Sequence, residues 1–308
     1  MNRSNLNFAA IVAATLLVVL HFVTGWRAAG VPERPFLSGL SAVLLLVAAA
    51  LLLYLTNDRI INEKSHFAPF IYLMLAAANP AALYLTTMHA AAILMAVSLY
   101  SYLRFSALAP DIGQLVIAWA TLGAAALFFP PLAWLAPIYA ATMTGRTEDK
   151  PRYWVAAILS LVLPVVLLIG VDYLLGRERP VEVLGNLWEG MTAIARPSFP
   201  VSAATLCRIL LTVLVTVVAS VRILGNLTRY RTVQYHALFR LLILSLSLGV
   251  LALLFTASGT LPFGLVVMLP VSLILNEYFR NPEIGHDIGT LGVVLLLVML
   301  AERIAFYV

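Results

Sequence analysis

The run LLLVAAALLL at residues 44–53 decides the fold class, because it is apolar on every side of a helix. A helix that is apolar all round is buried in a large protein or spans a membrane. The run does not alternate between apolar and polar residues, as the strands of membrane β-barrels do over about ten residues. The stretch therefore predicts a transmembrane helix.

The whole chain has the composition of a membrane protein. Its 308 residues are 62% hydrophobic and 11% charged, with a mean hydropathy of +0.99. An ordinary soluble domain is roughly 45–50% apolar and about 25% charged. We therefore expect an all-α protein, a polytopic bundle of transmembrane helices that forms a single membrane domain over residues 1–308.

The apolar segments predict about eleven spans. A helix needs about 20 residues to cross the hydrocarbon core. Three further pairs of apolar runs are interrupted by proline or polar residues and predict short helical hairpins. Nine or ten spans remain open, because a pair can also be a re-entrant element or one broken helix. The long segments are Phe8 to Trp26, Leu37 to Thr56, Tyr153 to Leu175, Ala203 to Leu224 and Thr290 to Val308, and the breaks lie at Asn79 to His89, at Pro130-Pro131 and at Ser258 to Pro262.

The first segment is interpreted as a span rather than as a cleaved signal peptide. Arg3 precedes it, as in a signal peptide, but the apolar run is long and no Ala-x-Ala site follows.

The basic residues predict the orientation, because Lys and Arg are enriched in short cytoplasmic loops. With eleven spans, twelve of the 19 basic residues lie on the side of the N-terminus and five on the other side. We therefore place the N-terminus in the cytoplasm. The net charge of +5 needs no nucleic acid to explain it. Membrane lipids are the expected partners.

Two polar interruptions are long enough to form structure of their own. Residues 176–202, on the predicted outer side, contain apolar residues at 184, 187, 188 and 191 that share one helical face. This pattern predicts an amphipathic helix in the interface, either a cap on the bundle or a lid over a site. On the inner side, Arg222 to Arg240 is interpreted as a basic joint near the headgroups.

Six ionisable residues lie within or at the ends of the predicted spans, where an unpaired charge is costly. All fall toward the predicted outer side. One interpretation is a pocket for a phosphate or carboxylate bound by arginine. The other is that the arginines reach the headgroups and the remaining groups pair with them or lie at the interface. The six residues are Arg208, Asp172, Glu302, Arg303, His21 and His89.

The motifs of common membrane enzymes are absent from the sequence. There is no His-Glu-x-x-His, no Gly-x-Ser-x-Gly and no Gly-x-x-x-x-Gly-Lys-Ser. The five histidines are divided between the two predicted faces, which disfavours a shared metal. We therefore predict no catalytic residue, no metal and no cofactor.

The expected function is the handling of a lipid or a lipid-linked anion, such as a lipid-linked phosphate, in envelope biogenesis. Such a protein transports the lipid, flips it or presents it to a membrane-protein partner, and it needs only a polar cavity and mobile helices. A transferase acting on a lipid-linked sugar is an alternative, with Glu33 as the only acidic candidate in the first outer loop. A structural or accessory subunit is a second alternative.

One region resembles a known family. Asp111 opens an Ala-rich helix that ends in Ala126-Leu127-Phe128-Phe129-Pro130, and a basic joint follows at Arg146 to Arg152. Leu163-Pro164 lies within the next apolar run, and Tyr102-Leu103-Arg104 precedes the region. These features resemble an uncharacterised family of polytopic membrane proteins of Bacteroidota. The resemblance covers about one fifth of the chain and implies an inner-membrane multi-helix protein without assigning an activity.

Overall fold

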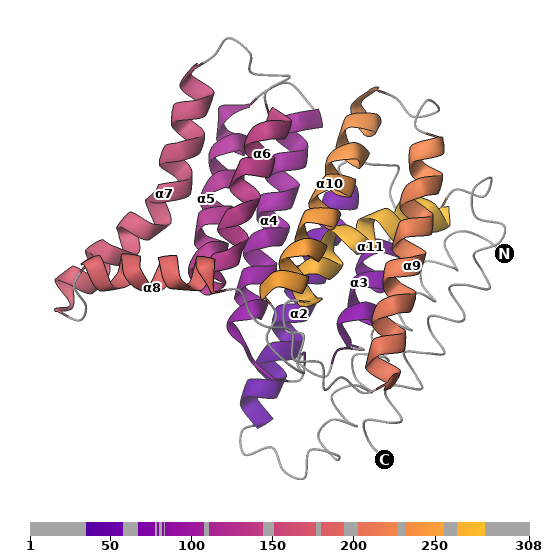
Figure 1. The fold of residues 1–308 in the computed structure, drawn as a ribbon, viewed down its shortest axis with the longest axis horizontal. Helices are drawn as coiled ribbons and strands as arrows, with labels where there is room; N and C mark the ends of the chain where they lie inside the picture. Colours follow the sequence, from indigo (N-terminus) through magenta and orange to yellow (C-terminus); the bar gives the residue numbers. More distant parts are fainter. Residues whose placement is uncertain are drawn as a thin grey trace.

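The computed structural model describes eleven stretches of the chain, and within them every regular element is a helix. Its elements are α2 (Pro35–Asn57), α3 (Phe67–Ala77), α4 (Thr87–Ala107), α5 (Ile112–Phe128), the 3₁₀-helix η2 (Pro130–Leu135), α6 (Ala136–Met143), α7 (Pro151–Leu174), α8 (Pro180–Thr192), α9 (Ala203–Gly225), α10 (Thr232–Phe255) and α11 (Gly264–Arg280). The described residues are 35–57, 67–77, 79, 82, 84–107, 111–143, 151–176, 180–193, 203–226, 232–255 and 264–280. Figure 1 shows their arrangement as a helical bundle.

Four of the described helices are long and apolar enough to cross a membrane. They contain the segments Gly39–Thr56, Thr87–Phe105, Pro151–Leu174 and Gln234–Phe255. Other apolar helical stretches are shorter, between 10 and 17 residues. The prediction of an all-helical protein is confirmed for the described residues, and the four helices suggest a membrane protein by their length and composition, whereas the count of eleven spans is not confirmed. The predicted spans Phe8 to Trp26 and Thr290 to Val308 lie outside the described residues.

Each of the three predicted breaks falls between two described helices. α3 ends at Ala77 and α4 begins at Thr87, and α5 ends at Phe128 before Pro130-Pro131 starts the 3₁₀-helix. The third break falls within residues 256–263, between α10 and α11. Proline at the start of η2 fits this pattern, because its fixed φ suits the first turn and it has no N–H to leave unpaired.

α4 is the centre of the bundle and contacts α2, α5, α10 and α11. Ala91, Ala92 and Ala96 are almost fully buried along it. Such small side chains let neighbouring helix backbones approach closely, which is how helices associate inside a bilayer. α2, α4 and α5 therefore lie side by side and form the wall on which the candidate site is built (Figure 1).

α8 lies crosswise to α7 and packs against η2 (Figure 1). Gly176, with φ of 64°, makes the turn after α7. The left-handed conformation of a glycine just past a helix end is a common way to terminate the helix. The indole Nε1 of Trp134 donates to the carbonyl of Met191 over 3.0 Å and ties the end of α8 to η2.

The exposed side chains of α8 are segregated. Leu184 and Trp188 are 51% and 64% exposed along one side. Glu182 and Glu189 are exposed along the opposite side, as the advance of about 100° per residue requires. The predicted amphipathic helix is therefore present over residues 180–192, and its position in the membrane interface remains a prediction.

Candidate functional site

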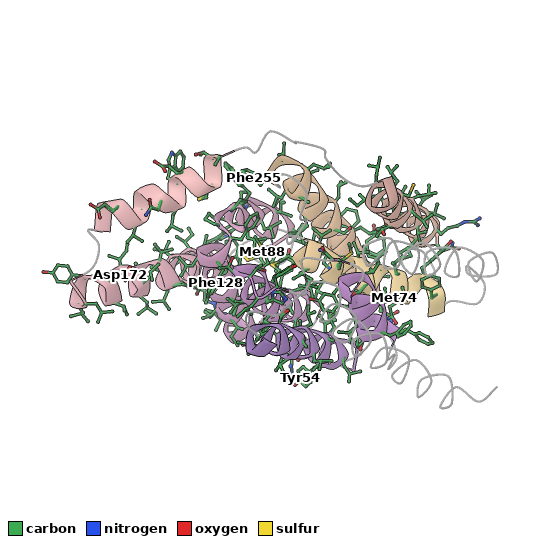
Figure 2. The ribbon with its side chains drawn as sticks, turned by 90° about the horizontal axis from the view of Figure 1, so that it is seen from below. Tyr54, Met74, Met88, Phe128, Asp172 and Phe255 are labelled. Atoms are coloured by element: carbon green, nitrogen blue, oxygen red, sulfur yellow. The ribbon has the colours of Figure 1, made fainter. Side chains whose placement is uncertain are left out.

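A groove lies between α2, α4 and α5 in the described part of the chain. Its volume is about 250 Å³. Tyr54 and Ile117 at its rim are exposed, and Figure 2 shows Tyr54 at the outer surface of α2. We call it the α2–α4–α5 groove. It is lined by Leu51, Tyr54, Val97, Tyr100, Ser101, Gln114 and Ile117.

Two contacts fix how the three helices are aligned along the groove. The Ser98 hydroxyl donates to the carbonyl of Ala118 over 2.7 Å, so α4 and α5 are level at these residues. The rings of Tyr54 and Tyr100 lie 5.2 Å apart, which aligns α2 with α4. Because α5 runs in the opposite direction to α4, residues near its start face the last turns of α4.

This alignment gathers the polar residues of the lining at one end, which we call the polar end, although the surface of the groove is almost entirely apolar. Leu51, Val97 and Ile117 each lie about one turn further from that end than Tyr54, Tyr100 and Gln114 do. Ser101 also lies toward the polar end.

Arg104 lies beside the polar end. Its Nη1 donates to the hydroxyl of Tyr100 over 2.6 Å, and its Cζ lies 5.8 Å from the centre of the same ring. Arg104 is in the last turn of α4. A cation is favoured there, because the carbonyl end of a helix carries partial negative charge. Helix geometry and the tyrosine thus hold a permanent positive charge next to the groove.

Gln114 supplies an unused acceptor. It is the third residue of α5, where a glutamine can reach back to the backbone N–H of the capping residue. The cap is instead made by Asp111, whose Oδ1 accepts from the N–H of Gly113 over 2.9 Å. The Oε1 atom of Gln114 is buried and has no hydrogen-bond partner among the described residues. A buried carbonyl without a hydrogen-bond partner is costly, and this oxygen is closed off from the almost entirely apolar surface of the groove.

A second polar cluster lies deeper, where α4, α6 and α10 meet. Arg240 is 7% exposed, and its Nη2 donates to the carbonyl of Thr142 over 2.9 Å. Its Cζ lies 5.9 Å from the ring centre of Tyr102, and Tyr102 stacks on Tyr139 at 4.0 Å. The Tyr139 hydroxyl lies 3.1 Å from that of Ser98. We call these five residues the Arg240 cluster.

The Arg240 cluster is a packing element rather than an accessible site. Tyr102 and Tyr139 are 1% and 0% exposed, and the hydroxyl of Tyr102 is hydrogen-bonded to that of Thr142. Arg240 had been assigned to the basic joint Arg222 to Arg240. That boundary is wrong, because α10 already begins at Thr232 and Arg240 lies in its third turn. Arg240 is instead a buried partner for the end of α6.

His89 is buried, 1% exposed, at the start of α4. Its Nε2 lies 2.8 Å from the hydroxyl of Ser41, which itself donates to the carbonyl of Ala82. Ser41 has one proton to give, so His89 must donate from Nε2. Nδ1 lies 3.3 Å from both the backbone nitrogen and the carbonyl oxygen of Thr86. His89 therefore fastens the α3–α4 connection, at the start of α4, to α2.

The structure places only part of the predicted outer pocket. Asp172 is half-exposed near the end of α7. Figure 2 shows it well away from Met88, the residue before His89, so these two predicted site residues are not brought together. The backbone of Arg208 belongs to α9. The side chain of Arg208 lies outside the described residues, as do His21, Glu302 and Arg303, and a pocket around them remains a prediction.

The described side chains include no group of three or more His, Cys, Asp or Glu that could hold a metal ion. No family model, curated protein or solved structure matches the chain. The resemblance to a Bacteroidota membrane family remains a prediction. The α2–α4–α5 groove was not among the predicted sites, because spacing along the chain does not reveal that α2 lies beside α4. The Tyr100 and Arg104 pair, one turn apart, was the only visible signal.

Proposed function

We propose that this protein binds a lipid or lipid-linked anion in the membrane and moves it or presents it to a partner, in the service of the cell envelope. The observation that carries the proposal is the α2–α4–α5 groove, whose surface is almost entirely apolar, together with Arg104, which is hydrogen-bonded to Tyr100 of its lining. An amphiphile has the same division between a hydrocarbon chain and a charged headgroup.

The energetics favour such a ligand. Burial of each CH₂ group of a chain is worth about 0.8 kcal/mol, and Leu51, Val97 and Ile117 offer apolar surface for it. Arginine binds phosphate oxygens through charge-assisted hydrogen bonds. Under the predicted orientation, Arg104 belongs to the cytoplasmic side, so the groove would meet lipids of the inner leaflet. This differs from the predicted outer pocket around Arg208.

Binding of a fluorescent phosphatidylglycerol to the purified protein in detergent micelles tests the proposal. Val97→Trp fills the groove, whereas Val155→Trp adds the same ring to an exposed site of α7, where Val155 is 55% exposed. We expect the first variant to bind at least tenfold more weakly and the second to bind like the parent. Equal binding by both variants, each of them folded by gel filtration and circular dichroism, would refute the groove as the lipid site.

Proteoliposomes distinguish movement from presentation. A carrier exposes an inner-leaflet fluorescent lipid to an impermeant quencher in the outer medium, and Val97→Trp slows this exposure. A presenting protein binds the same lipid but leaves its leaflet distribution unchanged. A transferase would instead yield a chemically altered lipid, which mass spectrometry of the extracted lipids detects.

A further inference from the structure

We infer that the α2–α4–α5 groove holds a single hydrocarbon chain, over about the eight carbons nearest to the headgroup, and not the headgroup itself. The inference rests on the proposed function and adds to it the part of the ligand that is bound. One chain is enough for binding. A second chain of the same lipid, and the further carbons of the bound chain, stay in the surrounding bilayer.

The chemistry of the groove surface is the first argument. This surface is almost entirely apolar, although two tyrosines, a serine and a glutamine belong to the lining. The Oε1 atom of Gln114 is buried, and the hydroxyl of Tyr100 accepts from Arg104. The polar atoms of the lining therefore offer little surface on which a headgroup could bind inside the groove. Hydrocarbon is the ligand chemistry that such a surface fits.

The surroundings of the groove are the second argument. Tyr54 and Ile117 at its rim are 57% and 42% exposed. Val47 lies one turn before the lining residue Leu51 in α2 and is exposed as well. The same is true of Val116, the neighbour of Ile117 in α5. The walls of an empty apolar hollow lose dispersion contacts, and in a bilayer the material beside an exposed apolar surface is lipid chain.

The size of the groove limits what it holds. Its volume is about 250 Å³. A methylene group takes up roughly the volume of a water molecule in the liquid, about 30 Å³, so the groove has room for about eight carbons. Two chains in the same room would be held over only about four carbons each.

The length of the lining agrees with this limit. Leu51 to Tyr54 and Gln114 to Ile117 each cover about one helix turn, about 5.4 Å along the axis. The hydrocarbon core of a bilayer is about 30 Å thick, so one leaflet contributes about 15 Å. A lipid chain is therefore longer than the groove, and only a part of it is held.

Arg104 determines which part of the chain that is. It lies in the last turn of α4, beside the polar end, whereas Val97 lies about two turns earlier in the same helix. A phosphate bound by Arg104 places the first carbons of its chain at Tyr100 and the next carbons at Val97 and Ile117. The groove therefore receives the carbons nearest to the headgroup, and the end of the chain lies beyond it.

Photo-crosslinking with a single-chain lipid tests the position of the chain. The probes are two lysophosphatidylglycerols with a diazirine at the fifth or at the fifteenth carbon, at low mole fraction in phosphatidylcholine proteoliposomes of the full chain. Mass spectrometry identifies the labelled residues. We expect the first probe to label the lining of the groove and the second probe to label residues outside it. Val97→Trp should lower the labelling of the groove by the first probe at least about fivefold, and Val155→Trp should leave it unchanged.

Competition tests the number of chains. Unlabelled lysophosphatidylglycerol and phosphatidylglycerol with the same acyl chain are added at equal mole fraction against the first probe. Both lie in the bilayer before they bind, so the hydrophobic transfer from water does not enter the comparison. We expect them to compete within about twofold, the statistical advantage of a lipid with two equivalent chains.

Failure of this inference is distinct from failure of the proposed function. Equal labelling of the groove by the two probes, or competition by the lysolipid that is about tenfold weaker or more, overturns the inference of one chain held near its headgroup. If Val97→Trp abolishes the binding of fluorescent phosphatidylglycerol but the first probe does not label the lining, the inference is also wrong, whereas the proposed function stands. If Val97→Trp changes neither the binding nor the labelling, the proposed function itself is refuted.

Discussion

Gly123 of α5 lies directly against the backbone carbonyl of Leu161 in α7. A Cβ atom at position 123 would be 2.3 Å from that oxygen, a distance that real side chains do not adopt. The described part of α7 buries only Tyr153, Ala157 and Ser160 against its neighbours. α7 also contains Pro164, whose missing N–H removes one intrahelical hydrogen bond and accounts for the bend seen in Figure 1. The glycine contact is therefore a large part of what holds α7 to the bundle.

Gly123→Ala should destabilise the protein. The new methyl group meets backbone rather than a flexible side chain, so α5 and α7 must separate, at a cost of about 1–3 kcal/mol. Thermal unfolding in detergent micelles measures the effect. Gly170→Ala, in α7, is the matched control, because nothing lies within 4 Å of its Cβ position. It should stabilise the protein by about 0.5–1 kcal/mol, since glycine is unfavourable inside a helix. Equal shifts in the two variants would contradict the packing at Gly123.

Gly190→Ala should loosen α8 from η2. A Cβ atom there would lie 2.7 Å from Cγ of Pro130, whose ring has little freedom to move. We expect faster hydrogen exchange of the backbone amides of α8, measured by mass spectrometry. Gly185→Ala is in the same helix with no atom within 4 Å of its Cβ position, and it should slow exchange slightly. Unchanged exchange in Gly190→Ala would mean that α8 is not held by this contact.

Ser41→Ala should cost about 1–3 kcal/mol, because it removes the hydroxyl that lies 2.8 Å from the Nε2 of the buried His89. Ser247→Ala is the comparison, since the Ser247 hydroxyl bonds only within its own helix, to the carbonyl of Ile243. It should change the stability by less than about 0.5 kcal/mol. The double variant Ser41→Ala with His89→Phe should recover part of the loss, because it removes both polar partners. If Ser41→Ala and Ser247→Ala unfold at the same temperature, the assigned role of His89 in fastening the start of α4 to α2 is wrong.

The sequence predicted the positions of the long helices well, but it did not predict which helices pack beside one another. The span predicted at Leu37 to Thr56 is observed as Pro35–Asn57, since the length of an apolar run is a local property. His89 was correctly singled out as a polar group near a helix end. Its role in fastening α4 to α2 depends on Ser41, which is 48 residues away in the chain, so spacing could not reveal it. The same holds for the groove, whose three walls come from separate helices.

Arg240 shows why charge alone misplaces a helix boundary, because this basic residue lies inside α10. Its substitution tests the Arg240 cluster. Arg240→Met keeps most of the aliphatic stem but removes the donor to the Thr142 carbonyl and the cation near the Tyr102 ring. A charged hydrogen bond and a buried cation–π contact together predict a loss of about 2–4 kcal/mol. Arg222→Met, at an exposed position in the last turn of α9, should change the stability by less than about 0.5 kcal/mol.

A double-mutant cycle then isolates the contact between the cation and the ring. Arg240→Met combined with Tyr102→Leu removes both partners, and we expect a coupling energy of at least about 0.5 kcal/mol. Tyr102→Phe keeps the ring but loses the hydroxyl that is hydrogen-bonded to Thr142. A second cycle starts from the Tyr102→Phe variant and replaces this Phe by Leu. The coupling energy with Arg240 should persist in this cycle, because the ring is still present in its starting protein. A coupling that disappears with the hydroxyl would show that Arg240 acts through the hydrogen bonds at the end of α6, and not through the face of the ring.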